Sequence, residues 1–160
     1  MMIQYSRRHR LIPGAMLLAA LAGILAGCGG EKEVRTEPVA LTGNIIVPDG
    51  VPADATVYVS LYHAWALEGE LRHPVEFIEG FETSAGEFAH DFDYPVDAGE
   101  GLLVYAWIDS DADGILCTPT VRIDRAGLTE VQDFVPGDVA ADVELVVPCA
   151  GPDWFYPPAE

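Results

Sequence analysis

Short runs rich in Val, Ile, Tyr and Phe recur along the chain from Val39 onward, separated by clusters of Gly, Pro and Asp. Several runs alternate apolar and polar positions, as at Val57, Val59 and Leu61, which is the pattern of a β-strand with one buried face. The segment 101–108 is apolar at almost every position, which indicates a central strand covered on both sides. The pattern predicts strands at residues 41–47, 56–62, 75–81, 87–94, 101–108, 120–123 and 139–147, with a weaker eighth at 131–135.

This succession of strands predicts the fold class. Seven or eight short strands in about 110 residues, with turn signals between them, are typical of an all-β antiparallel sandwich or small barrel. The segment 64–72 fits a strand least well, so we expect one helical turn or a loop there and very little helix elsewhere. Alternation places two more sets of side chains on shared faces: Phe88, His90 and Phe92, and Val143, Leu145 and Val147 opposite Asp142 and Glu144.

The N-terminal segment has the anatomy of an export signal. A basic start at residues 7–10 precedes an apolar run at 15–26, which is shorter than the ~20 residues that cross a bilayer. The run ends in Leu25-Ala26-Gly27-Cys28, which closely resembles the lipobox of bacterial lipoproteins. That resemblance implies that residues 1–27 are removed and that Cys28 carries a diacylglyceryl thioether, usually with a third acyl chain on the new amino group. The alternative is an ordinary cleaved signal peptide with a chance cysteine.

A lipidated Cys28 would make the membrane the first partner of this protein. Each buried methylene contributes ~0.8 kcal/mol, so two or more acyl chains anchor a protein almost irreversibly. Gly29 rather than Asp follows Cys28, which resembles the outer-membrane default of Gram-negative lipoproteins. Residues 6–11 partly resemble a twin-arginine signal, with Arg10 in place of a hydrophobic residue, so the export route stays open.

The remaining chain divides into three parts. Residues 28–38 are polar and without periodicity, as expected of a flexible tether. Residues 39–148 form the expected sandwich domain, and residues 149–160 are a tail rich in Pro and aromatic residues. The aromatics at 154–156 could stack on a sugar or a partner protein, but a tail folded back over an apolar edge is the commoner outcome.

The charge is strongly negative. The chain has 26 Asp and Glu against 8 Lys and Arg, and three of those basic residues lie in the signal segment, which leaves 5 − 26 = −21 for the mature chain. Nucleic acid is excluded as a partner, because its binding depends on Lys and Arg at phosphates. The acidity favours cations, or it is simply a solvated surface.

Two cysteines remain once Cys28 is lipidated. Cys117 and Cys149 form an even pair in an oxidising compartment, and neither lies in a CxxC motif. The sequence therefore predicts a Cys117–Cys149 disulfide, which requires the loop after strand 101–108 and the end of the last strand to meet at one end of the domain.

The segment Asp109-Ser110-Asp111-Ala112-Asp113-Gly114 is the sharpest motif. Alternate carboxylates before a glycine resemble the first half of a calcium-binding loop, with Asp109, Asp111, Asp113 and the Ile115 carbonyl as ligands. Position twelve is Thr120 rather than a bidentate Glu, so other groups must complete the usual ~6 to 8 oxygens. The alternative is an acidic turn that binds nothing strongly.

The expected topology suggests where further ligands for Ca²⁺ would lie. If each early connection reverses the chain, the turns at 48–55 and 82–87 share an end with the acidic loop. The candidates are Asp49, Asp54, Glu82 and Glu87. Asp97 and Glu100 would lie a full strand away, roughly 26 Å, and are excluded.

No catalytic motif stands out. His63, His73 and His90 lack the close spacing of a zinc site and are expected as two loop histidines and a core-facing His90. There is no Gly-x-Ser-x-Gly, no His-Glu-x-x-His and no glycine-rich phosphate loop, and no carboxylate pair is singled out among the 26 acids.

Four segments between Val39 and Val147 resemble a family in their order: Thr42-Gly43-Asn44-Ile45, residues 57–61, Gly86-Glu87-Phe88 and residues 101–109. They are similar to transthyretin-like and carboxypeptidase-regulatory-like sandwiches of exported bacterial proteins, although Leu103 replaces a frequent aromatic. The resemblance implies an immunoglobulin/transthyretin-like sandwich that is a non-catalytic module. We therefore expect an envelope lipoprotein that binds or supports an unknown envelope protein or polysaccharide. The alternatives are an accessory hydrolase of envelope polymers and a cation-handling protein.

Overall fold

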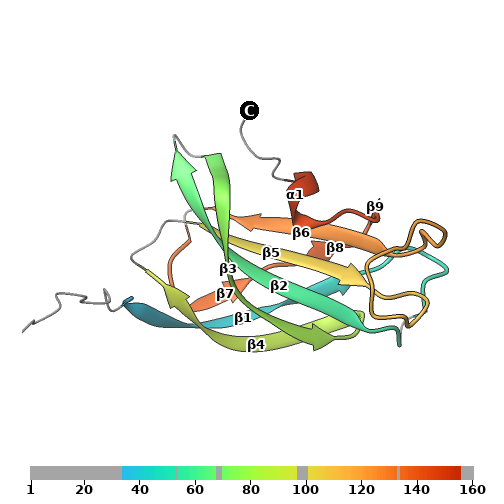
Figure 1. Cartoon of the computed structure of the whole chain (residues 1–160). Coiled ribbons are helices and arrows are strands. Elements are labelled where there is room, and N and C mark those ends of the chain that lie inside the picture. Colours follow the sequence, from blue (N-terminus) through green and yellow to red (C-terminus); the bar gives the residue numbers. More distant parts are fainter. Residues whose placement is uncertain (1–33, 53, 68–69, 97–100, 133, 156–160) are drawn as a thin grey trace, which may run out of the picture. The chain divides into compact units, whose positions relative to one another are not determined.

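The computed structural model describes residues 34–52, 54–67, 70–96, 101–132 and 134–155; of residues 65–67, 70–75 and 154 it describes the backbone alone. The signal segment and Cys28 therefore lie outside the described residues, and so do Asp97 and Glu100. The described part holds these elements (Figure 1): β1 (Thr36–Ile46), β2 (Val57–Leu67), β3 (Glu70–Thr83), β4 (Gly86–Pro95), β5 (Gly101–Ile108), β6 (Arg125–Val131), β7 (Asp138–Ala140), β8 (Val143–Glu144), β9 (Val147–Pro148) and the single-turn helix α1 (Pro152–Phe155).

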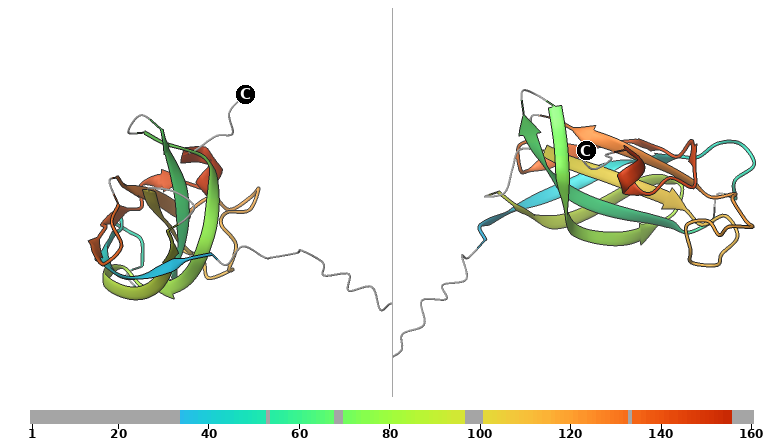
Figure 2. Two further views of the ribbon diagram at one scale, coloured as in Figure 1. Left: turned by 90° about the vertical axis from the view of Figure 1, so that its left-hand side faces the viewer. Right: turned by 45° about the horizontal axis from the view of Figure 1, so that its top comes forward.

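Two sheets face each other, which confirms the all-β sandwich (Figure 2). The first has the order β4-β1-β7, with β8 also paired to β1, and the second has the order β3-β2-β5-β6-β9. We call them sheet A and sheet B. As expected, β5 lies at the centre of sheet B, and its residues are buried at nearly every position.

Most strand pairs are antiparallel, but β1 pairs in parallel with β7 and β8. The chain crosses from β6 in sheet B to the free edge of β1 in sheet A, and it reverses direction as it crosses. It therefore runs alongside β1 in the same sense. The sheet is mixed at this edge, which differs from the fully antiparallel arrangement predicted.

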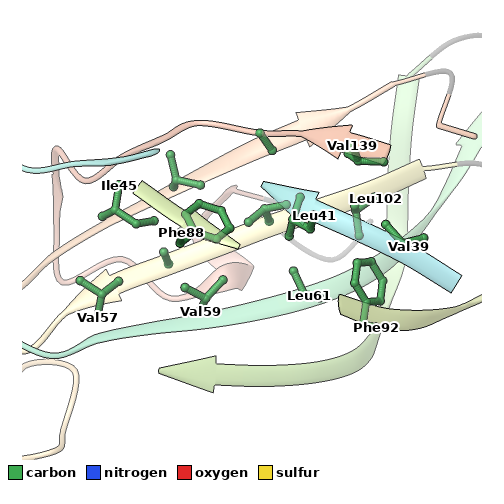
Figure 3. Close-up of a cluster of buried hydrophobic side chains, with 14 of the residues drawn as sticks. Val39, Leu41, Ile45, Val57, Val59, Leu61, Phe88, Phe92, Leu102 and Val139 are labelled. Carbon is green, nitrogen blue, oxygen red and sulfur yellow. The ribbon is translucent and has the colours of Figure 1, made fainter. Parts of the chain in front are cut away.

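The core fills the space between the two sheets (Figure 3). Val57, Val59 and Leu61 point into it from β2, as their alternation predicts. Phe88 and Phe92 do so from β4, whereas His90 between them is only half-buried, so the prediction of a core-facing His90 is only partly met. The buried set is Val39, Leu41, Ile45, Val57, Val59, Leu61, Phe88, Phe92, Tyr94, Leu102, Val104, Ala106, Ile108, Val139, Ala141, Val143 and Leu145.

The segment 138–148 closes one side of the sandwich, and it is not the single strand 139–147 that the pattern predicted. It pairs with β1 through β7 and β8 and then with β6 through β9, so it is broken into three pieces as it passes between the sheets. Its backbone passes very close to two glycines. A Cβ on Gly43 would lie 2.0 Å from the Ala141 carbonyl oxygen, and one on Gly127 would lie 2.1 Å from that of Glu144. Only glycine permits this approach.

Three further predictions of local structure are wrong. Residues 120–123 are not a strand: Val121 N–H donates to the Thr118 hydroxyl at 3.0 Å and its carbonyl accepts from Thr118 N–H at 2.9 Å, so the β-branched run forms a turn. Among the described residues of 131–135, which leave out Asp133, only Val131 belongs to a strand, and Val135 is exposed just before Pro136 and Gly137. The segment 64–72 is the end of the β2–β3 hairpin rather than a helical turn, because the hairpin arms extend to Leu67 and from Glu70.

The described part of the C-terminal tail covers the outer face of sheet B. The Tyr105 hydroxyl donates to the Ala150 carbonyl at 2.8 Å, and the Phe155 ring of α1 packs edge-on against the Tyr105 ring at 6.3 Å. Tyr105, Ala126 and Ala150 form a small buried cluster there. This is the structural role expected for the tail, seen for residues 149–155.

Candidate metal centre

The acidic loop spans residues 109–124, between β5 and β6, at one end of the sandwich (Figure 1). Asp109 is fixed where β5 ends, because its N–H donates to the Thr56 carbonyl at 2.9 Å, next to the start of β2. The side chain of Asp109 turns inward, and the residue is only 4 % exposed.

The carboxylate of Asp109 organises the first half of the loop. It accepts hydrogen bonds from Asp113 N–H at 3.2 Å and from Gly114 N–H at 2.8 Å. Gly114 adopts a positive φ of 74°, as the tight turn requires. The Asp113 carboxylate accepts from Ile115 N–H at 2.8 Å on the exposed side of the turn.

The carboxylate of Asp124 organises the second half. It is 1 % exposed and accepts from Ser110 N–H at 2.9 Å and from Cys117 N–H at 2.8 Å. Sequence reasoning did not find Asp124, because it lies outside the contiguous motif and directly follows the run 120–123 that resembled a strand. No local pattern separates it from the other acids, and the fold alone brings it to Asp109.

The structure groups three carboxylates. Oxygens of Asp109, Asp111 and Asp124 lie within 4.8 Å of one another. Of the predicted ligands, Asp109 and Asp111 belong to this group and Asp113 does not, while the Ile115 carbonyl stays a prediction. The pKa of Asp111 is raised, first by desolvation and then by the negative charges of neighbours such as Asp113 and Asp124.

The four candidate ligands from other turns are not part of the group. The register Val57–Ile108 and Val57–Thr83 does place the turns near 48–55 and 82–87 at the end that holds the acidic loop. Of the four, Asp49 lines a surface depression that it shares with the acidic loop, together with Ser110, Ile123 and Arg125. Among the described residues, the three-carboxylate group is the only cluster of this type.

The donor set fits a hard cation. Buried carboxylates are costly unless a positive charge or hydrogen bonds compensate them, and here each buried carboxylate has only backbone N–H donors among the bonds described above. Each oxygen keeps a further lone pair that a cation can use. Three carboxylates would offer at least three oxygens to such a cation, and water or backbone carbonyls would complete its shell.

A disulfide lies beside this group. Cys117 and Cys149 are joined with their Cα atoms 5.5 Å apart, as the sequence predicted. The backbone N–H groups of both cysteines donate to Asp124. Cys117 N–H donates to its carboxylate, and Cys149 N–H donates to its carbonyl at 3.2 Å. The bond therefore ties the acidic loop to the end of the last strand.

The histidines do not gather into a metal site within the described part of the chain. His63 is buried on β2 with its ring edge-on to Tyr94. Burial lowers the pKa of His63, and the negative charge of Glu76 partly offsets this shift. His90 contacts the Glu79 carboxylate through Nε2 and stacks on the Phe81 ring at 3.9 Å. The side chain of His73 is outside the described residues.

No helix among the described residues has the length and apolar character needed to cross a membrane. Comparisons of the chain with protein-family models, with curated proteins and with solved structures found no match.

Proposed function

We propose that this protein is a lipid-anchored envelope lipoprotein whose sandwich domain is a non-catalytic binding or structural module, with one Ca²⁺ stabilising the loop 109–124. The observation that supports the cation is the group of Asp109, Asp111 and Asp124 oxygens, two of the three carboxylates being buried. The carboxylates of this loop accept hydrogen bonds from five of its own backbone N–H groups, which favours a structural role over an acid-base one.

The anchor is proposed from the sequence Leu25-Ala26-Gly27-Cys28. Eight residue steps separate Cys28 from Thr36, where β1 begins, and they reach at most about 28 Å. A domain on such a short tether stays close to the membrane surface.

The direction of β1 fixes which end of the domain is near the tether. Its far end leads into Pro48 and Asp49, which line the depression shared with Ser110 of the acidic loop. The tether therefore joins the domain at the end opposite the acidic loop. The eleven residues of β1 span about 35 Å between these two ends of the domain.

Calorimetric titration of the metal-free protein with Ca²⁺ tests this function. The proposal expects one saturable ion for each chain and a higher melting temperature on binding, because a ligand that binds only the folded state stabilises it. Stoichiometric binding of many ions would instead favour the cation-handling alternative. Turnover of envelope polysaccharide by the purified protein would favour the hydrolase alternative.

A further inference from the structure

The outer face of sheet B carries an aromatic surface that the proposed function does not use. The strand register shows which residues of this surface are neighbours. Glu82, Tyr58 and Trp107 lie side by side across β3, β2 and β5. Two residues along β2, Gly80, Ser60 and Tyr105 form the next row, followed by Phe77, Tyr62 and Leu103. The middle row thus holds the small residues Gly80 and Ser60 beside Tyr105, which the tail covers, and it lies between two rows that contain paired rings.

The rings are arranged as packed pairs. Tyr58 and Trp107 stack with their centroids 4.5 Å apart, and Tyr62 meets Phe77 edge-on at 5.6 Å. Phe77 leans over the small residues, since its Cζ would lie 3.8 Å from a Cβ on Gly80. It is 57 % exposed, so its ring is accessible at the surface of sheet B.

Among the side chains that the structure describes, the charges near these aromatic rows are negative. Glu82 is exposed beside Tyr58. Asp153 lies in α1, whose Phe155 ring packs against Tyr105 of the middle row. Burial raises the pKa of Tyr62, a hydrogen bond with Ser60 opposes the shift, and the negative charge of Asp153 adds to it. Arg125 is the only Lys or Arg of β2, β3, β5 and β6 whose side chain is described. Its neighbour Ala126 faces outward, so Arg125 faces the opposite side of the sheet.

We propose that this face docks a cationic segment of a partner protein, whose Arg or Lys side chains lie on the rings of Tyr58, Tyr62, Phe77 and Trp107 beside the carboxylates of Glu82 and Asp153. Aromatic faces attract cations through their quadrupole, and guanidinium groups stack on them best. The complementarity is between an aromatic, acidic surface and a basic segment. Neutral glycans carry no positive charge, and a second copy of the chain has a strongly negative net charge.

Binding of a defined peptide tests the proposal. The mature protein in a neutral detergent is titrated into fluorescein-labelled Gly-Arg-Gly-Arg-Gly-Arg at 0.15 M salt, with EDTA present so that the result is independent of the calcium site. The matched probe has citrulline, which is neutral and similar in shape, at each Arg. We expect saturable binding of the Arg peptide and at least roughly tenfold weaker binding of the citrulline peptide.

Variants separate the aromatic surface from the net charge. Tyr62→Leu with Phe77→Leu keeps apolar side chains and should weaken the Arg peptide roughly tenfold. Glu82→Gln should weaken it several-fold, whereas Asp91→Asn, the same charge change at an exposed residue of β4 in sheet A, should change it less than about twofold. Phe77→Leu alone, at an exposed position, serves if the double variant does not fold.

Four outcomes would overturn the proposal. Equal binding of the citrulline peptide would show that positive charge is not recognised. Unchanged binding by the Leu variants, or an equal loss in Asp91→Asn and Glu82→Gln, would show attraction by net charge alone. A dimer that Phe77→Leu dissociates, seen by sedimentation, would assign the face to a second copy of the chain.

Discussion

The buried carboxylate of Asp124 accepts a hydrogen bond from Cys117 N–H at 2.8 Å, which joins the two ends of the loop segment 117–124. The Asp124 carbonyl also accepts from Cys149, the other half of the disulfide. One aspartate thus links the acidic loop, the disulfide and the last strand.

Asp124→Asn should destabilise the domain. The amide keeps one acceptor oxygen but places an NH₂ group against Ser110 or Cys117 N–H, which leaves a buried donor without an acceptor. We expect a loss of about 1–3 kcal/mol in the free energy of unfolding, measured by urea denaturation in EDTA. Asp113→Asn is the control, since its exposed side chain keeps an oxygen for Ile115 N–H and should cost less than about 0.5 kcal/mol. Equal stability of the two variants would contradict the role assigned to Asp124.

Asp111→Asn should abolish stabilisation by Ca²⁺, because Asp111 belongs to the carboxylate group and is exposed. For the unsubstituted protein, Ca²⁺ at a hundred times Kd should add about 2.7 kcal/mol, which corresponds to a rise of roughly 10 °C in Tm. Scanning calorimetry with and without Ca²⁺ measures this. Asp113→Asn removes the same charge two residues away and should keep most of the gain; a greater loss in Asp113→Asn than in Asp111→Asn would restore the ligand set predicted from the sequence.

Reducing the Cys117–Cys149 disulfide should lower the free energy of unfolding by about 3–4 kcal/mol, since the bond closes a loop with a sequence separation of 32. Urea denaturation with and without reductant measures the loss, and alkylation under denaturing conditions should find neither thiol free before reduction. A double Cys→Ser variant should match the reduced protein and no longer respond to reductant. An unchanged urea midpoint on reduction would rule out the contribution proposed for this bond.

Gly127→Ala should disrupt the crossing between the sheets. Its Cβ would lie 2.1 Å from the Glu144 carbonyl oxygen, so the backbone of 143–144 must move away from β6. We expect a cost of about 1–3 kcal/mol or more, again from urea denaturation. Gly151→Ala, where a Cβ meets nothing within 4 Å, is the control and should be near neutral. A Gly127→Ala protein as stable as its control would show that this close approach is easily relieved.

Cys28→Ser should yield a protein without lipid, because only a thiol forms the thioether. In detergent phase partition the variant should be found in the aqueous phase, and mass spectrometry should find no acyl chains on it. Cys117→Ser, outside the lipobox, should keep the lipid. An unmodified Cys28 in the membrane-extracted natural protein would end the lipoprotein proposal.

The sequence by itself determined the elements whose signals are local. Alternation at Val57, Val59 and Leu61 and the apolar run of β5 place those residues correctly, because a strand with one or two buried faces must repeat with period two or be apolar throughout. The disulfide was predicted because only two cysteines remain once Cys28 is assigned to the lipid. The position of the acidic loop followed from its own residues.

The tertiary structure alone decided what depends on distant backbone. Residues 120–123 have strand-forming side chains, yet two hydrogen bonds between Thr118 and Val121 hold that region as a turn. Segment 139–147 is broken because it must pair with β1 in one sheet and β6 in the other, across Gly43 and Gly127. Asp124 joined the candidate site for the same reason: its partners are fifteen residues away in sequence at Asp109 and twenty-five away at Cys149, and such pairings leave no periodic trace along the chain.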